Sequence, residues 1–175
     1  INSMFYDPTE DKVIDHVNGQ QDLDEKLIRF IGDPHQRIEE DHLRILRAIR
    51  FKNTLDFQYH PDTYKALVDH KELVTKVSAE RTREELNKMI NTDAEHRVNA
   101  FQDMEDIGVL KLILPEFTDM MGVAQPTKYH KEGDVWKHSL KALAELSDHA
   151  STSLRWAVIM HDIGKPDTFT IKNDR

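Results

Sequence analysis

The residue types most able to do chemistry lie close together in one segment, Glu40-Asp41-x-x-Arg44-x-x-Arg47-x-x-Arg50-Phe51. At 100° per residue, a continuous helix would carry Asp41 and the three arginines in a diagonal ridge, opposite its apolar positions. Asp41 offers acceptors and Arg44 a fork of donors, which together could hydrogen-bond the edge of a planar ligand. Arg47 and Arg50 could bind phosphate by charge and bidentate geometry. The segment therefore predicts a nucleotide-binding site.

A solvated helix face is the alternative interpretation of this segment. In that case Asp41 and Arg44 would form an ion pair at spacing i, i+3, contributing about 0.2–0.5 kcal/mol. The local charge argues against it, because residues 43–52 carry four basic side chains and no acid in a chain of net charge -8. Arginines three apart repel one another unless a ligand or a partner neutralises them.

A second group of chemically capable residues lies near the end of the chain. His138 is followed by the doublet His161-Asp162, and imidazole with carboxylate suits divalent ions such as Mn, Zn, Ni or Fe. Adjacent side chains converge on one ion only at a helix end, which Gly164 and Pro166 favour. Among ten histidines, a chance His-Asp pair is the alternative.

Mostly helical elements must position these residues. Residues 4–6 and 13–17 are predicted strands of a hairpin, joined by a polar turn, and Asn18-Gly19 is a further turn signal. Residues 27–31 form an apolar run of undetermined type. Helices are predicted over 36–52, from Pro61, over 79–90 from the N-cap Ser78, and over 94–107 between a Thr92/Glu95 capping box and Gly108. Shorter helical segments follow at 109–114 and 116–121, then helices at 135–149 and 154–163.

Composition sets limits on the function. The 175 residues are 38% hydrophobic and 32% charged, and they include no cysteine, so a disulfide framework and a thiolate zinc site are excluded. No apolar run approaches the roughly 20 residues of a membrane span, and no signal peptide is visible, so a cytoplasmic protein is expected. The acidic balance argues against a broad surface for nucleic acid but allows a local site.

Four segments, taken in order, resemble one enzyme family. The arginine segment resembles the neck-helix motif of the class II tRNA nucleotidyltransferase (CCA-adding enzyme) and bacterial poly(A) polymerase family. Residues 1–7 resemble the end of that family's head-domain motif. The hinge motif of the family is similar to Asp15-x-x-x-Gly19-x-x-Asp22-Leu23, continuing through residues 28–34. The second neck motif is similar to Ser78-x-Glu80-Arg81-x-x-x-Glu85-Leu86.

The resemblance implies a mainly α fold and three regions. Residues 1–33 would end a nucleotidyltransferase head domain with a β-hairpin remnant and the hinge. Residues 34–124 would form a helical neck and body that binds nucleotide and RNA. Residues 125–175 would begin an HD-type helical unit. We expect the chain to be a piece of a longer protein, without the catalytic head, and inactive alone.

The resemblance also assigns roles to the arginine segment. Asp41 and Arg44 would act as a protein template for the base of incoming CTP or ATP, and Arg47 and Arg50 would support that pair or contact phosphate. The supporting residues would be Glu40, Arg81 and Glu85, although pairing within one helix explains the last two almost as well. The catalytic carboxylates and their Mg²⁺ would lie in the head, so no catalytic residue is expected here. The expected partners are tRNA, CTP and ATP, with no membrane.

The C-terminal segments resemble the HD-domain phosphohydrolase superfamily. They are Tyr129-His130-x-Glu132-Gly133-Asp134-Val135-Trp136-x-His138 and the run from Leu154 to Pro166 that contains His161-Asp162-Ile163-Gly164-Lys165. The resemblance implies His138, His161 and Asp162 as ligands of a divalent metal such as Mn, Ni or Mg. A downstream Asp, the last ligand of the superfamily, has no counterpart, which predicts weak binding. Lys165 could contact a phosphate or favour a helix C-terminus, while Trp136 and Trp156 are expected in the core.

Three functions remain open from the sequence. The first is addition of CCA to tRNA 3′ ends, with bacterial polyadenylation as a variant of the same chemistry. The second is a metal-dependent HD-type phosphohydrolase whose N-terminal helices position the substrate. The third is a non-catalytic module that binds RNA or acts as a scaffold.

Overall fold

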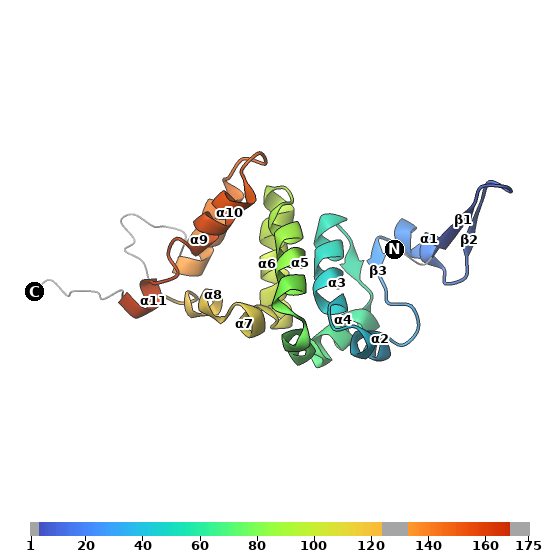
Figure 1. Ribbon diagram of the computed structural model, residues 1–175, viewed down its shortest axis with the longest axis horizontal. Coiled ribbons are helices and arrows are strands. Elements are labelled where there is room, and N and C mark those ends of the chain that lie inside the picture. The colour runs from blue at the N-terminus through green and yellow to red at the C-terminus, as the bar shows by residue number, and fades with distance from the viewer. Residues whose placement is uncertain (1–3, 124–132, 169–175) are drawn as a thin grey trace, which may run out of the picture.

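The computed structural model describes residues 4–123 and 133–168, and it confirms a mainly α fold with a small hairpin at the N-terminal end (Figure 1). The elements follow one another along the long axis of the molecule, from the hairpin at one end to α11 (Lys165–Thr168) at the other. Two sequence-based predictions lie outside the described residues: the start of the head-domain motif and the segment Tyr129-His130-x-Glu132. Within the described ranges, no helix combines the length and apolarity that crossing a membrane requires.

The predicted hairpin is confirmed. Strands β1 (Met4–Asp7) and β2 (Lys12–Asp15) pair antiparallel, with Met4 opposite Asp15. Asn18 adopts the left-handed conformation (φ 58°) and leads into α1 (Gly19–Asp24), a helix that was not predicted. The Asp15 carboxylate accepts the backbone N–H groups of residues 17, 19 and 20, which lowers the pKa of that carboxyl group. Strand β3 (Leu27–Ile28) then pairs in parallel with β4 (Gln58–Tyr59).

Helices form the rest of the described chain. In order they are α2 (Pro34–Glu40), α3 (Arg44–Thr54), α4 (Pro61–Asp69), the 3₁₀ helix η1 (Lys71–Lys76), α5 (Ala79–Ile90), α6 (Ala94–Ile107), α7 (Leu110–Ile113), α8 (Pro115–Asp119), α9 (Val135–Ala144) and α10 (Thr152–Met160).

The prediction of one helix over 36–52 is wrong, because the chain breaks at Asp41. That residue is extended (φ −152°, ψ 103°), so α2 ends at Glu40 and α3 begins at Arg44. The Asp41 carboxylate accepts the N–H of Leu43 at 3.2 Å, a local bond that competes with the helical ladder. The sequence pattern fitted a helix on both sides of the break, so the apolar periodicity did not reveal it.

The predicted helix starts are mostly confirmed. Ser78 caps α5, His60 with Pro61 begins α4, and Gly108 ends α6 in the left-handed conformation (φ 88°). The Thr92/Glu95 capping box is wrong: Asp93 is the N-cap and accepts the His96 N–H at 3.1 Å. Thr92 instead donates its hydroxyl to the Met89 carbonyl at the end of α5. At the C-terminal end, α9 is shorter than predicted, and α10 begins and ends earlier.

One continuous core joins α3, α5, α6, α9 and α10. Phe101 on α6 lies within 6.3 Å, between ring centroids, of both Trp136 and Trp156, so the prediction that both tryptophans belong to the core is confirmed. A polar network centred on the buried Asp103 carboxylate links α3 and β4 to α6. This carboxylate accepts hydrogen bonds from the Asn53 side-chain amide at 3.0 Å and from the Tyr59 hydroxyl at 2.7 Å. Burial and the nearby Asp103 raise the pKa of Tyr59.

Two fully buried arginines fasten the α9–α10 pair to the turn between α5 and α6. Arg155 donates to four backbone carbonyls, of Ile90 (2.7 Å), Thr92 (2.9 Å), Asp148 (2.7 Å) and Ala150 (3.2 Å). Arg97 donates to the carbonyls of residues 92, 143 and 146 and to the carboxylate of Asp148. These bonds satisfy carbonyls that the helix ends leave open.

Candidate nucleotide cleft and metal cluster

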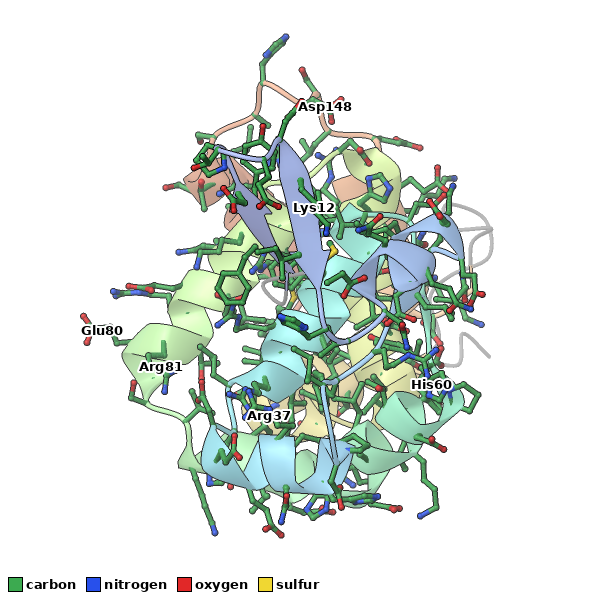
Figure 2. The ribbon with its side chains drawn as sticks, turned by 90° about the vertical axis from the view of Figure 1, so that its right-hand side faces the viewer. Lys12, Arg37, His60, Glu80, Arg81 and Asp148 are labelled. Atoms are coloured by element: carbon green, nitrogen blue, oxygen red, sulfur yellow. The ribbon has the colours of Figure 1, made fainter. Side chains whose placement is uncertain are left out.

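A cleft of about 540 Å³ lies between the N-terminal elements and α3. Basic and aromatic side chains from three segments face it: Arg29 and Phe30 after β3, Arg37 on α2, and Arg44, Arg47 and Phe51 on α3. The same wall includes the predicted hinge residues Gly19 and Asp22. Figure 2, viewed along the long axis, shows Arg37 on α2 in the lower part of the view and Asp148 near its top.

Arg44 is held in place by the end of α2. Its Nη1 donates to the Glu40 carboxylate at 2.9 Å and to the Arg37 carbonyl at 2.8 Å. The break at Asp41 makes this possible, because a helix that stops at Glu40 leaves its last carbonyls open to a cation. The Arg37 side chain also pairs with Glu40. The Arg44 side chain is 26% exposed, so it is held by α2 and still partly accessible.

Asp41 does not form the intrahelical ion pair with Arg44 that the alternative interpretation of this segment requires. Its carboxylate oxygens accept from Arg81 Nη2 at 3.1 and 3.2 Å, a contact between residues 40 positions apart. The Asp41 side chain is 29% exposed. Arg81, near the start of α5 (Figure 2), therefore holds the acidic residue, and Glu40 holds the basic one.

Arg47 faces the cleft without an ion-pair partner among the described residues. Its guanidinium carbon lies 5.9 Å from the centroid of the Phe51 ring, which orients the side chain without neutralising it. A half-buried arginine of this kind is a ready binding group for an anion.

Arg50 points to α5 instead of lining the cleft. Its Nε donates to Glu85 at 2.7 Å, and its guanidinium carbon lies 4.0 Å from the centroid of the Phe51 ring. Glu85 is buried and also accepts from Lys88 at 2.8 Å. Burial opposes ionisation of Glu85, but the hydrogen bonds from Lys88 and Arg50 outweigh it and lower the pKa of the carboxyl group.

Two cleft arginines were not predicted as site residues. Arg29 donates to the Asp22 carboxylate at 2.9 Å, so the hinge segment forms an ion pair in the cleft wall. Arg37 precedes Arg44 by seven positions, which is nearly two helical turns. The break at Asp41 places the two arginines on different helices, so a shared helix face could not have revealed Arg37.

The predicted metal ligands come together at the far end of the molecule. One ligand atom from each of His138, His161 and Asp162 lies within 4.8 Å of the other two. Asp162 Oδ2 is 3.1 Å from His161 Nε2 and 4.0 Å from His138 Nε2. Two imidazoles and one carboxylate are a donor set that suits a borderline divalent ion, so these residues fit a metal. Lys165 Nζ lies 2.6 Å from the same oxygen.

Asp134, which lies next to this cluster in sequence, has a structural use. It is the N-cap of α9, and its carboxylate accepts the N–H groups of Lys137 (2.9 Å) and Gly122 (3.1 Å). His130 and Glu132 lie outside the described residues.

Two family models match the chain. The model described as "Poly A polymerase head domain" matches residues 1–29, and the model described as "Probable RNA and SrmB- binding site of polymerase A" matches residues 56–121.

Curated relatives extend the match. The chain is 33% identical over 171 residues to the multifunctional CCA protein of Pseudomonas fluorescens, covering 94% of the chain and 40% of that protein. It is 33% identical over 169 residues to the A-adding tRNA nucleotidyltransferase of Deinococcus radiodurans, covering 90% of the chain and 37% of that protein. The chain thus spans about two fifths of the length of these relatives.

Solved structures show the same fold. The CCA-adding enzyme of Bacillus stearothermophilus, in complex with CTP, matches with a TM-score of 0.70 and 24% identity, over 93% of this chain and 37% of that one. A tRNA nucleotidyltransferase complexed with a primer tRNA and an incoming ATP analog matches with a TM-score of 0.61 and 22% identity, over 87% of this chain and 43% of that one. Together with the ordered motifs, these matches show that the chain belongs to the tRNA nucleotidyltransferase and poly(A) polymerase family.

Proposed function

We propose that the protein containing this chain adds CCA to tRNA 3′ ends from CTP and ATP, and that this chain selects the nucleotide. The names of the relatives support tRNA nucleotidyl transfer over polyadenylation. The observation that carries the proposal is the fixed guanidinium of Arg44 at the wall of the cleft, beside the unneutralised Arg47.

In this proposal Arg44 and Asp41 read the base by hydrogen bonding. Both structural bonds of Arg44 use Nη1, which leaves the donors on Nε and Nη2 for a base edge. The Asp41 carboxylate accepts from Arg81 and from the Leu43 N–H, and its Oδ2 retains one lone pair for an exocyclic amino group. Arg47 would bind the triphosphate, and Arg50 with Glu85 would hold α3 against α5.

The Mg²⁺ expected for nucleotidyl transfer needs paired carboxylates. Asp22 is the one carboxylate residue among those that line the described cleft, and Arg29 already holds it. The cleft residues therefore do not fit that pair of metals, and we assign no step of the transfer to them. Their proposed contribution is selection and orientation of the nucleotide.

The test is Arg44→Ala in the full-length protein, assayed for CTP and ATP incorporation into a tRNA acceptor. A bidentate contact to a base contributes about 1–3 kcal/mol of discrimination, so base choice should fall roughly five- to 150-fold. The matched control is Arg83→Ala, an exposed arginine of α5 that lies outside the cleft lining. Unchanged base choice in Arg44→Ala would refute the proposal.

The converging histidines support a second proposed activity, a metal-dependent phosphohydrolase of the HD type. His138, His161 and Asp162 would hold the ion, which would activate water or polarise a phosphate oxygen. We expect phosphatase activity of the full-length protein to rise with Mn²⁺ or Ni²⁺ and to vanish in His161→Ala. Equal activity of this variant and the wild type would refute the assignment.

A further inference from the structure

Lys165 is directed at the same oxygen that the two histidines approach. Its Nζ lies 2.6 Å from Asp162 Oδ2, closer than His161 Nε2 at 3.1 Å and His138 Nε2 at 4.0 Å. An ammonium group at this distance forms a charge-assisted hydrogen bond, the strongest kind that a carboxylate makes with a lysine.

The spacing of the other three groups suits one metal ion. Nitrogen and oxygen ligands at about 2.0–2.2 Å from an ion lie roughly 3 to 4 Å apart. The distances from Asp162 Oδ2 to the two histidines fall in this range. An ion bound to Oδ2 between the imidazoles would therefore share this oxygen with the ammonium group or displace it.

The chain keeps Lys165 close to the carboxylate. The Lys165 N–H donates to the Asp162 carbonyl at 3.0 Å, in a turn that leads directly into α11. The Asp162 side chain is 13% exposed and that of Lys165 is 29% exposed. Because the pair is partly buried, solvent and salt screen the attraction between its charges less than on an open surface.

We propose that Lys165 is a built-in counter-ion that competes with a divalent metal for Asp162. A metal entering this site must displace the ammonium group from the carboxylate or bind beside a positive charge, and both costs weaken its binding. Lys165 thus lowers the metal affinity of the site while keeping the carboxylate neutralised and in place. The inference rests on the proposed metal site and assigns to that site a residue that limits its affinity.

The test is calorimetric titration of the full-length protein with Mn²⁺, and separately with Ni²⁺, at constant pH and ionic strength. Lys165→Met removes the competing charge and should tighten binding about tenfold, equivalent to about 1.4 kcal/mol. Lys165→Arg keeps the charge and should bind like the wild type. Lys111→Met, at an exposed lysine of α7, is the control for a change in net charge.

Equal or weaker metal binding by Lys165→Met than by the wild type would overturn the counter-ion role and leave the metal site standing. Absence of binding in both proteins, or undiminished binding in His161→Ala, would instead overturn the metal site itself, and the counter-ion role with it. The far-ultraviolet circular dichroism and melting temperature of each variant establish that it is folded, so weaker binding cannot be assigned to misfolding.

Discussion

The molecule uses arginine in two contrasting ways. Arg97 and Arg155 are fully buried, and backbone carbonyls occupy most of their donors. Arg44 and Arg47 lie in the cleft wall. Arg44 uses one nitrogen for bonds to α2, and Arg47 has no carboxylate partner among the described residues. The comparison teaches that the donors left over, and not the positive charge, separate a binding arginine from a structural one.

The buried pair shows how far carbonyls can replace counter-ions. The described ion-pair partner of Arg97 is Asp148, whose side chain is 64% exposed, and the other described bonds of Arg97 go to backbone carbonyls. Burial and the neighbouring Arg155 both lower the pKa of Arg97. Charged donors nevertheless satisfy the open carbonyls at the ends of α5 and α9, which explains why cations are tolerated there.

The largest expected effect comes from removing a buried guanidinium. Arg155→Met would leave four carbonyls without a donor and should lower the free energy of unfolding by about 3–5 kcal/mol. Urea denaturation measures this loss. The matched Arg83→Met change on the surface should stay within about 0.5 kcal/mol. A loss below about 1 kcal/mol in Arg155→Met would contradict the structural role.

An intermediate effect is expected at Glu85, where a buried carboxylate joins α3 to α5. Glu85→Gln should cost about 1–3 kcal/mol at pH 7, because two charged donors lose their charged acceptor. The folded-state pKa is below the ordinary value of 4.5, so this stabilisation is complete above that pH and is lost as the pH falls through the folded-state pKa.

The difference in unfolding free energy between wild type and Glu85→Gln, measured from pH 7 to pH 3, should therefore shrink below about pH 4.5. A difference that stays constant over this range would show that the ion pairs of Glu85 do not contribute.

The cleft arginines should show the opposite pattern, with function lost and stability kept. Arg47→Ala should leave the free energy of unfolding within about 0.5 kcal/mol and raise the KM of the full-length protein for CTP and ATP alike, by about tenfold. An equal effect on both nucleotides separates a phosphate contact from base recognition by Arg44. A change confined to one nucleotide would contradict the phosphate role.

The smallest effect on stability is expected at the exposed pair of Asp41 and Arg81. Arg81→Ala should cost about 0.2–1 kcal/mol of unfolding free energy. Base discrimination by the full-length protein should fall by more than this stability loss suggests, because Asp41 would lose its orientation. A double-mutant cycle between the two positions measures the coupling. Zero coupling in discrimination would show that Arg81 does not position Asp41.

Local chemistry made much of the fold predictable from the sequence. Ser78, Pro61 and Gly108 mark helix ends through the backbone conformations that they favour, and the hairpin follows from its polar turn. The convergence of His138 with His161-Asp162 was expected from the resemblance to the HD-domain superfamily. The three regional boundaries and the roles of the site residues remain predictions.

Contacts between distant residues were not predictable. The pairing of Asp41 with Arg81 and the carbonyl bonds of Arg97 and Arg155 depend on how helices pack, which no local pattern encodes. The break at Asp41 was missed for a different reason. The apolar pattern continues through it, but the Asp41 side chain bonds the Leu43 N–H in place of a helical backbone bond. The pair formed by β3 and β4 is only two residues long in each strand, too short to leave a pattern.

The interruption at Asp41 makes the orientation of Arg44 depend on a separate short helix. Arg44 takes its orientation from the Arg37 carbonyl and the Glu40 carboxylate, both of which belong to the seven-residue α2. Any swing of that short rod about the interruption would re-aim the Arg44 guanidinium while the path of α3 stays unchanged. If Arg44 reads the base as proposed, a tilt of α2 would therefore change base preference without any change in α3.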